Sequence, residues 1–166
     1  MDLMKKFIID TNILVGAMGN YYKEPGKPPG INAKIVLGAL LEYFQPAFTH
    51  SLVKEYLYQL KDKHLPGMKY LDGKPRPPQW LGDFLNKGAL YKDMPFARIP
   101  GVFYTADDDD FPILCLSIDQ DFPIVTKNLK DFPEEGRYGA SVLNPRDFLE
   151  REPSLKTINS WDSWAM

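Results

Sequence analysis

The sequence predicts an α/β fold built on a central parallel sheet. Short apolar runs typical of strands, such as residues 6–9 and 122–126, alternate with longer segments of helical periodicity. Strands separated by helices form βαβ units, whose strands pair in parallel. At 166 residues, with 44% hydrophobic and 25% charged residues, the chain has the size and composition of a single globular domain.

The expected elements can be placed along the chain from their periodicity and from the prolines and glycines between them. We expect strands at 6–9, 44–49, 122–126 and 141–143, an extended segment at 97–103, and helices at 12–18, 32–43, 51–60, 79–92, 111–118 and 145–151. Ser51 is the expected N-cap of its helix. Residues 19–30 and 66–79 are expected loops. Residues 1–151 form the predicted domain. Residues 152–166, with Trp161 and Trp164, form a tail that either packs on the body or binds a partner.

Composition excludes several classes of protein. No apolar run approaches the ~20 residues that a membrane span needs, so we expect no membrane association. One cysteine and two histidines are too few for a typical zinc site. Cys115 lies in an apolar run and is expected to be a buried thiol of a cytoplasmic protein.

Charge is unevenly distributed along the chain. Residues 54–100 carry nine Lys/Arg against five Asp/Glu, whereas residues 104–150 carry eleven Asp/Glu against four Lys/Arg. This segregation is typical of a protein that binds a cation in one place and a polyanion in another. An unevenly charged solvated surface explains it equally well.

Acidic residues recur where the predicted strands end. Asp10 follows the first strand, Glu55 lies early in the helix after the second, Asp107–Asp110 precede a helix, and Asn128 and Asp131 follow a later strand. In a parallel sheet these positions converge on one edge. Carboxylates forced together repel each other unless a divalent cation neutralises them, and all-oxygen ligands favour Mg²⁺ or Mn²⁺. Metal-assisted phosphoryl transfer is the chemistry that this pattern predicts.

Each acidic residue also has a simpler explanation. Asp10 can cap the first helix, Glu55 is favourable near a helix N-terminus, and the aspartate run can be a solvated cap. Asp131 can be an ordinary loop residue. Only the joint placement favours a shared cation.

Five segments carry a more specific pattern, in the order Ile9–Leu14, Thr49–Glu55, Asp108–Ser117, Val125–Phe132 and Val142–Leu149. From Lys6 to about Glu150 the chain resembles the PIN-domain family, metal-dependent ribonucleases that include VapC-type toxins. The resemblance implies a three-layer α/β/α sandwich with a central parallel sheet, often a homodimer. It also implies cleavage of RNA at an acidic Mg²⁺ site, and a small antitoxin protein that inhibits the nuclease in toxin–antitoxin pairs.

The resemblance assigns roles to individual residues. The aspartate of the third segment corresponds to Asp110, with Asp109 as the alternative. Many members carry an aspartate where this chain has Asn128, which leaves Asp131 as the fourth acid and bears on whether a second metal binds.

The resulting hypothesis is a Mg²⁺- or Mn²⁺-dependent ribonuclease, the toxin of a type II toxin–antitoxin pair. Its catalytic and metal-binding residues are Asp10, Glu55, Asp110 and Asp131, and its substrate-binding residues are Asn12, Thr126 and Asn128. Candidates for steering the RNA backbone are Lys61, Lys63, Lys69, Lys74 and Arg76.

Three alternatives to this hypothesis remain. The first is an inactive PIN-fold scaffold that binds RNA or protein. A phosphatase of the haloacid dehalogenase type is disfavoured because Asn12 stands where its second aspartate is needed. The third is a response-regulator receiver, which is disfavoured because it needs paired acids near the start of the chain and a phosphoacceptor on a middle strand. Separately, Tyr21 and Tyr22 either stack on bases or pack against the body.

Overall fold

A computed structural model describes residues 4–23, 26–62, 70–71, 74–75, 77–93, 111–133 and 139–164. The strands are β1 (Lys6–Ile9), β2 (Gln45–Thr49), β3 (Tyr70–Leu71), β4 (Lys74–Pro75), β5 (Ala89–Tyr91), β6 (Ile124–Val125) and β7 (Val142–Leu143). The helices are α1 (Thr11–Lys23), α2 (Ile31–Leu40), α3 (His50–Asp62), α4 (Gln79–Lys87), α5 (Phe111–Gln120) and α6 (Pro145–Arg151). Short 3₁₀ helices are η3 (Leu129–Asp131) and η5 (Pro153–Thr157).

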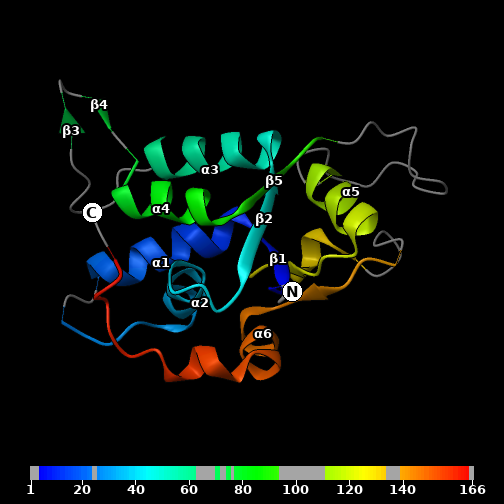
Figure 1. Ribbon diagram of the computed structural model, residues 1–166. Helices are drawn as coiled ribbons and strands as arrows, with labels where there is room; N and C mark the ends of the chain where they lie inside the picture. Colours follow the sequence, from blue (N-terminus) through cyan, green and yellow to red (C-terminus); the bar gives the residue numbers. More distant parts are fainter. Residues whose placement is uncertain are drawn as a thin grey trace.

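The predicted fold class is confirmed. Five parallel strands form one sheet in the order β5-β2-β1-β6-β7. Figure 1 shows α1, α2, α3 and α4 on one side of this sheet and α5 on the other, which is the expected α/β/α sandwich. A small antiparallel pair, β3 and β4, lies inside the segment that we expected to be a loop.

The hydrophobic core surrounds β1, the central strand. Phe7, Ile8 and Ile9 are all buried, so side chains on both faces of this strand are covered, as is typical of a parallel sheet between helices. The Phe7 ring packs edge-to-face against Phe44 and Phe148, with centroid distances of 5.7 and 4.7 Å. The expected burial of Cys115 is also confirmed, and burial raises the pKa of its thiol to about 11.

The first helix is longer than predicted. α1 continues through Gly19 to Lys23, where we expected a loop. A glycine inside a helix costs about 1 kcal/mol relative to alanine. Packing offsets this cost, because Tyr21 at the end of α1 contacts the rings of Trp161 and Trp164 at centroid distances of 5.1 and 5.8 Å. Tyr21 and Tyr22 therefore pack against the body.

The predicted ends of two other helices need correction. α2 stops at Leu40 because Glu42 adopts a left-handed conformation (φ 63°) and Tyr43 donates its N–H to the Gly38 carbonyl, a Schellman-type ending. Tyr43, expected on the apolar face, is 49% exposed. The N-cap of α3 is Thr49 rather than Ser51, since the Thr49 hydroxyl accepts the N–H of Leu52 at 3.4 Å.

The predicted helix over residues 79–92 was wrong in its second half. α4 ends at Lys87, and Ala89–Tyr91 form β5, an edge strand paired only with β2 in the described part of the chain. Gly88 separates the two elements in an extended conformation. The strand is three residues long and its central Leu90 is 53% exposed, so it carries no alternation of polar and apolar residues by which a strand could be predicted.

Residues 153–164 pack on the body. Leu155, Ile158 and Trp164 are buried in the same core as the sheet. The Trp164 ring stacks on Trp80 of α4 at a centroid distance of 4.5 Å, and the Trp161 indole N–H donates to the Lys27 carbonyl at 2.9 Å. The described residues of the tail therefore pack on the body, which is the first of the two predicted possibilities. No helix in the described ranges is both long and apolar enough to cross a bilayer.

Candidate functional site

The candidate site lies at the carboxyl ends of β1 and β6, where the strand order reverses. From β1 the chain adds β2 and then β5 on one side, and it later returns to add β6 and β7 on the other. Ligands of open α/β sheets bind at such a reversal. Asp10 is the residue after β1 and Thr126 the residue after β6, and the Asp10 N–H donates to the Val125 carbonyl at 2.9 Å.

Asp10 is held by three side-chain and backbone donors. Its Oδ1 accepts the N–H of Thr11 at 2.8 Å, and its Oδ2 accepts the Thr126 hydroxyl at 2.7 Å and the Asn12 amide at 3.3 Å. Only 5% of Asp10 is exposed. These hydrogen bonds fix the orientation of the Asp10 carboxylate. Oδ2 accepts two of them and Oδ1 only one.

The environment of Asp10 opposes its ionisation. Burial raises the pKa of Asp10, and the negative charge of Asp131 raises it further. The hydrogen bonds from Thr126 and Thr11 act against this rise, because they stabilise the carboxylate. The net pKa of Asp10 lies above 3.8. A positive charge between Asp10 and Asp131 would attract both carboxylates and favour their ionised forms.

The loop after β6 extends the network towards solvent. The Thr126 hydroxyl accepts the N–H of Asn128 at 3.1 Å, and the Asn128 amide donates to Asp131 Oδ2 at 3.0 Å. On the other side, Asn12 Oδ1 accepts the N–H of Lys127 at 3.1 Å. Asn128 and Asp131 are exposed, whereas Thr126 is buried. One network thus connects a buried carboxylate to a solvent-facing one.

Glu55 approaches the same region from α3. It is half-buried, and its neighbour Tyr56 is buried with its hydroxyl donating to the Ile9 carbonyl, directly before Asp10. Burial raises the pKa of Tyr56 well above 10, and the negative charges of Asp10 and Glu55 raise it further. The Tyr56 hydroxyl therefore lies in the field of both carboxylates.

Several predicted residues lie outside the described part of the chain. These are Asp110, its alternative Asp109, and the cations Lys63, Lys69 and Arg76; the side chains of Lys61 and Lys74 are likewise not described. Within the described ranges, no three Asp, Glu, His or Cys residues are grouped closely enough to hold a metal ion. The described network thus contains Asp10, Asn12, Thr126, Asn128 and Asp131, with Glu55 nearby.

Sequence reasoning missed three residues that the structure places here. Tyr56 was expected only as part of an apolar face, and nothing local indicates that its hydroxyl meets Ile9. Thr11 donates its N–H to Asp10, while its own hydroxyl oxygen is buried with no hydrogen-bond partner in the described structure. Lys127 was not singled out, although its position directly after Thr126 was a usable signal.

Comparison with known proteins supports the fold. No protein-family model and no curated protein sequence matches the chain. Among solved structures, the chain is similar to one in the crystal structure of VapBC2 from Rickettsia felis bound to a DNA fragment from their promoter. The TM-score is 0.52 with 15% sequence identity, and the match covers 84% of this chain and 98% of that chain. The two chains share a fold. This finding supports the PIN-like architecture that the sequence motifs imply.

Proposed function

We propose that this protein is a Mg²⁺- or Mn²⁺-dependent endoribonuclease. The observation that carries the proposal is the state of Asp10: a buried carboxylate, oriented by three donors, at the strand-order reversal and in the field of Asp131. Capping α1 does not account for the position of Asp131, whose negative charge opposes the ionisation of Asp10. The shared fold with a VapBC2 chain is consistent with this activity.

The donor atoms of the proposed ligands are of the kind that a hard divalent cation prefers. Asp10, Glu55 and Asp131 offer only carboxylate oxygens, the ligands that Mg²⁺ and Mn²⁺ prefer. A carboxylate has about four lone-pair sites. Oδ2 of Asp10 already accepts two hydrogen bonds and Oδ1 accepts one, so Oδ1 retains capacity for a cation. Asp110 is the proposed fourth carboxylate.

Each remaining residue has a proposed task in the hydrolysis. A bound divalent cation supplies activation of the attacking water and neutralises charge that develops on the phosphodiester. Thr126 and Asn12 keep Asp10 in one orientation through their hydrogen bonds. Asn128 positions Asp131 and presents an amide towards solvent, where it can contact phosphate. One of the carboxylates accepts the proton of the attacking water.

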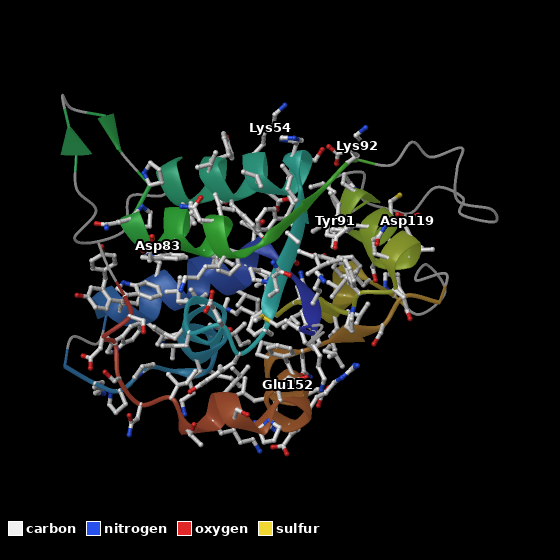
Figure 2. All side chains as sticks on the ribbon, in the orientation of Figure 1. Lys54, Asp83, Tyr91, Lys92, Asp119 and Glu152 are labelled. Atoms are coloured by element: carbon white, nitrogen blue, oxygen red, sulfur yellow. The ribbon has the colours of Figure 1, made fainter. Side chains whose placement is uncertain are left out.

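Exposed cations border this edge of the sheet, which suits an RNA substrate. Lys92 directly follows β5, and Lys54 lies in the first part of α3 after β2; both are exposed, and Figure 2 shows them on the same side of the molecule, pointing outward. Such lysines attract a polyanion to an otherwise acidic site. As further parts of the proposal, a small antitoxin protein inhibits the enzyme, the chain forms a homodimer, and it acts in the cytoplasm.

The test is cleavage of a mixed RNA pool in Mn²⁺ by wild type and Asp10→Asn, after purification through a denaturing step that removes any bound inhibitor. We expect cleavage by wild type and a loss of about a hundredfold or more in Asp10→Asn, the scale of a lost catalytic carboxylate. Asp83→Asn is the matched control, because Asp83 is a carboxylate of α4 that takes no part in the hydrogen-bond network of Asp10 and Asp131, and it should retain activity. Figure 2 labels its position. Equal cleavage by all three proteins would refute the assignment of Asp10.

The scaffold alternative predicts a different result. An inactive scaffold cleaves no RNA, and Mn²⁺ gives neither heat in calorimetry nor a rise in melting temperature. The nuclease binds Mn²⁺ through Asp10, so its melting temperature rises with Mn²⁺ and this rise is smaller in Asp10→Asn. Wild type that folds but neither binds Mn²⁺ nor cleaves RNA would favour the scaffold.

A further inference from the structure

One buried polar group at the candidate site takes part in no hydrogen bond. Thr11 begins α1 directly after Asp10 and is 4% exposed, and its hydroxyl oxygen is buried without a partner in the described structure. Among the described residues, the other buried side-chain atoms of this kind belong to Asn32, Trp80 and Trp164, and none of these residues hydrogen-bonds to Asp10. The Thr11 hydroxyl is therefore the group of this site whose presence the fold does not explain.

Two other buried hydroxyls at the same strand end are fully used. The hydroxyl of Thr126 donates to Asp10 Oδ2 at 2.7 Å and accepts a backbone N–H at 3.1 Å. The hydroxyl of Tyr56 donates to the Ile9 carbonyl. A buried hydroxyl without a partner costs stability, because it has given up its hydrogen bonds to water. The fold avoids this cost at Thr126 and Tyr56 but not, in the described part of the chain, at Thr11.

Covalent geometry keeps the Thr11 hydroxyl close to the Asp10 oxygen that has spare capacity. The Thr11 nitrogen lies 2.8 Å from Asp10 Oδ1. Within one threonine the hydroxyl oxygen is at most ~4 Å from the backbone nitrogen, so it lies within ~7 Å of Oδ1. Oδ1 accepts only this one hydrogen bond, whereas Oδ2 accepts two. The unpaired hydroxyl is therefore a neighbour of the oxygen to which we assign the cation.

A hydrated divalent cation can satisfy a hydroxyl at this distance. Mg²⁺ binds oxygen atoms at ~2.1 Å and usually keeps several of its water molecules. A water molecule of that hydration shell, hydrogen-bonded to a hydroxyl at ~2.8 Å, spans up to ~7 Å from a carboxylate oxygen on the same cation. The protons of such a water molecule point away from the cation and need an acceptor. The oxygen of a threonine hydroxyl has two lone pairs and can serve as that acceptor.

We propose that Thr11 is a positioning residue of the metal site, whose hydroxyl oxygen accepts a hydrogen bond from a water molecule that hydrates the cation on Asp10 Oδ1. This inference rests on the proposed metal-dependent function and adds to it a residue outside the set of carboxylates. Groups that hold the ligands of a metal in place contribute to its affinity without touching the metal. The same hydroxyl costs stability when the cation is absent. Valine at this position should therefore weaken the metal complex without destabilising the metal-free protein.

Calorimetric titration with Mn²⁺ measures this contribution without RNA and without cleavage. The protein is first stripped of divalent cations with EDTA and transferred to buffer without chelator. Thr11→Val keeps the branched shape of the side chain and removes the hydroxyl. We expect its Mn²⁺ affinity to fall about tenfold or more, the scale typical when a group that holds a metal ligand in place is lost. Its melting temperature without Mn²⁺ should equal or exceed that of wild type, because a buried polar atom is removed and no hydrogen bond is lost.

Two further variants separate this role from a structural one. Thr11→Ser keeps the hydroxyl and should bind Mn²⁺ nearly as tightly as wild type. Thr157→Val makes the same change in η5, where the hydroxyl donates to the Ser154 carbonyl at 2.7 Å, outside the hydrogen-bond network of Asp10. Its Mn²⁺ affinity should equal that of wild type, and its melting temperature should not rise, because this variant does lose a hydrogen bond. The two valine variants thus differ in both measurements.

The outcomes distinguish the role of Thr11 from the ribonuclease proposal. Unchanged Mn²⁺ affinity in Thr11→Val overturns this role, and so does a lower melting temperature of that variant without Mn²⁺, because the hydroxyl then has a structural partner. If Asp10→Asn loses Mn²⁺ binding and cleavage in the same preparations, the ribonuclease proposal stands without Thr11. If Mn²⁺ binding depends on Thr11 but wild type cleaves no RNA, the role of Thr11 stands and the ribonuclease proposal fails. A wild type that binds no Mn²⁺ overturns both.

Discussion

Tyr56→Phe tests the contact that fixes the strand end before Asp10. The Tyr56 hydroxyl donates to the Ile9 carbonyl, and its ring packs edge-to-face against Phe48 and Phe84 at centroid distances of 6.5 and 6.0 Å. Phenylalanine keeps these ring contacts and removes only the hydroxyl. The variant therefore measures the hydrogen bond itself, in a fully buried setting.

The expected loss follows from burial. A buried acceptor deprived of its donor costs about 1–3 kcal/mol in the free energy of unfolding. For a domain of this size that corresponds to roughly 2–12 °C in melting temperature. Urea denaturation at pH 7 gives the free energy, with the slope m compared between proteins. Tyr58→Phe is the matched control, because Tyr58 lies on the same helix and is 65% exposed; it should change stability by less than about 0.5 kcal/mol.

The pH dependence gives an independent check. Burial raises the pKa of Tyr56 well above 10 in the folded protein, whereas the unfolded chain titrates near 10. The folded state then retains a proton that the unfolded state loses, so this stabilisation is present below about pH 10 and falls as pH rises further. The stability difference between wild type and Tyr56→Phe should narrow above pH 10. A Tyr56→Phe protein as stable as Tyr58→Phe, or a difference that is constant from pH 9 to 11, would refute the reasoning.

Three further predictions concern other parts of the molecule. Trp164→Ala should lower the free energy of unfolding by about 3–5 kcal/mol, because Trp164 is buried against Trp80. Trp161→Ala should lower it less, because Trp161 is partly exposed. Equal urea midpoints for the two variants would contradict this. Burial raises the pKa of Asp10, so the folded protein loses stability as pH rises from 3.8 through the folded pKa. Asp10→Asn lacks this loss, so its melting temperature minus that of wild type should be larger at pH 7 than at pH 3.5. Asn144→Ala removes the N-cap of α6, whose Oδ1 accepts the Asp147 N–H at 2.7 Å, and should cost about 1 kcal/mol by thermal unfolding.

Local sequence patterns were sufficient to predict four strands of the central sheet, β1, β2, β6 and β7, but not β5. β1, β2 and α6 were predicted within a residue. The apolar run of β1 ends before Asp10, that of β2 ends at Thr49, and the pair Asn144-Pro145 marks the start of α6. The parallel arrangement then follows from the order of strands and helices. It brings Asp10 and Thr126 to the same sheet edge, as expected, and the structure adds the hydrogen bond that joins them.

The errors arose where contacts distant in sequence override local preference. Gly19 lies inside α1 because the aromatic contacts of Tyr21 with residues 140 and more positions later outweigh its cost. β5 exists because β2 offers an edge, not because Ala89–Tyr91 has a strand pattern. The placement of Lys127 above Gly16 depends on the packing of α1 against α2, which no local pattern encodes. Asp110, central to the predicted metal site, stays a prediction, because it lies outside the described residues.

The energetics of Asp10 support the proposal that its carboxylate binds a cation. As a helix cap alone, an asparagine or serine would accept the Thr11 N–H equally well and carry no buried charge. Here burial and Asp131 both disfavour ionisation, while Thr126 and Asn12 donate to the carboxylate and hold it in place. Such an arrangement lowers the stability of the isolated protein at neutral pH, and the proposed cation would restore it by neutralising both carboxylates. The rise in melting temperature with Mn²⁺ should therefore depend on Asp10 and Asp131 together. If both carboxylates bind one cation, the double variant Asp10→Asn/Asp131→Asn should lose less of this rise than the sum of the losses in the two single variants, and strictly additive losses would contradict a shared cation.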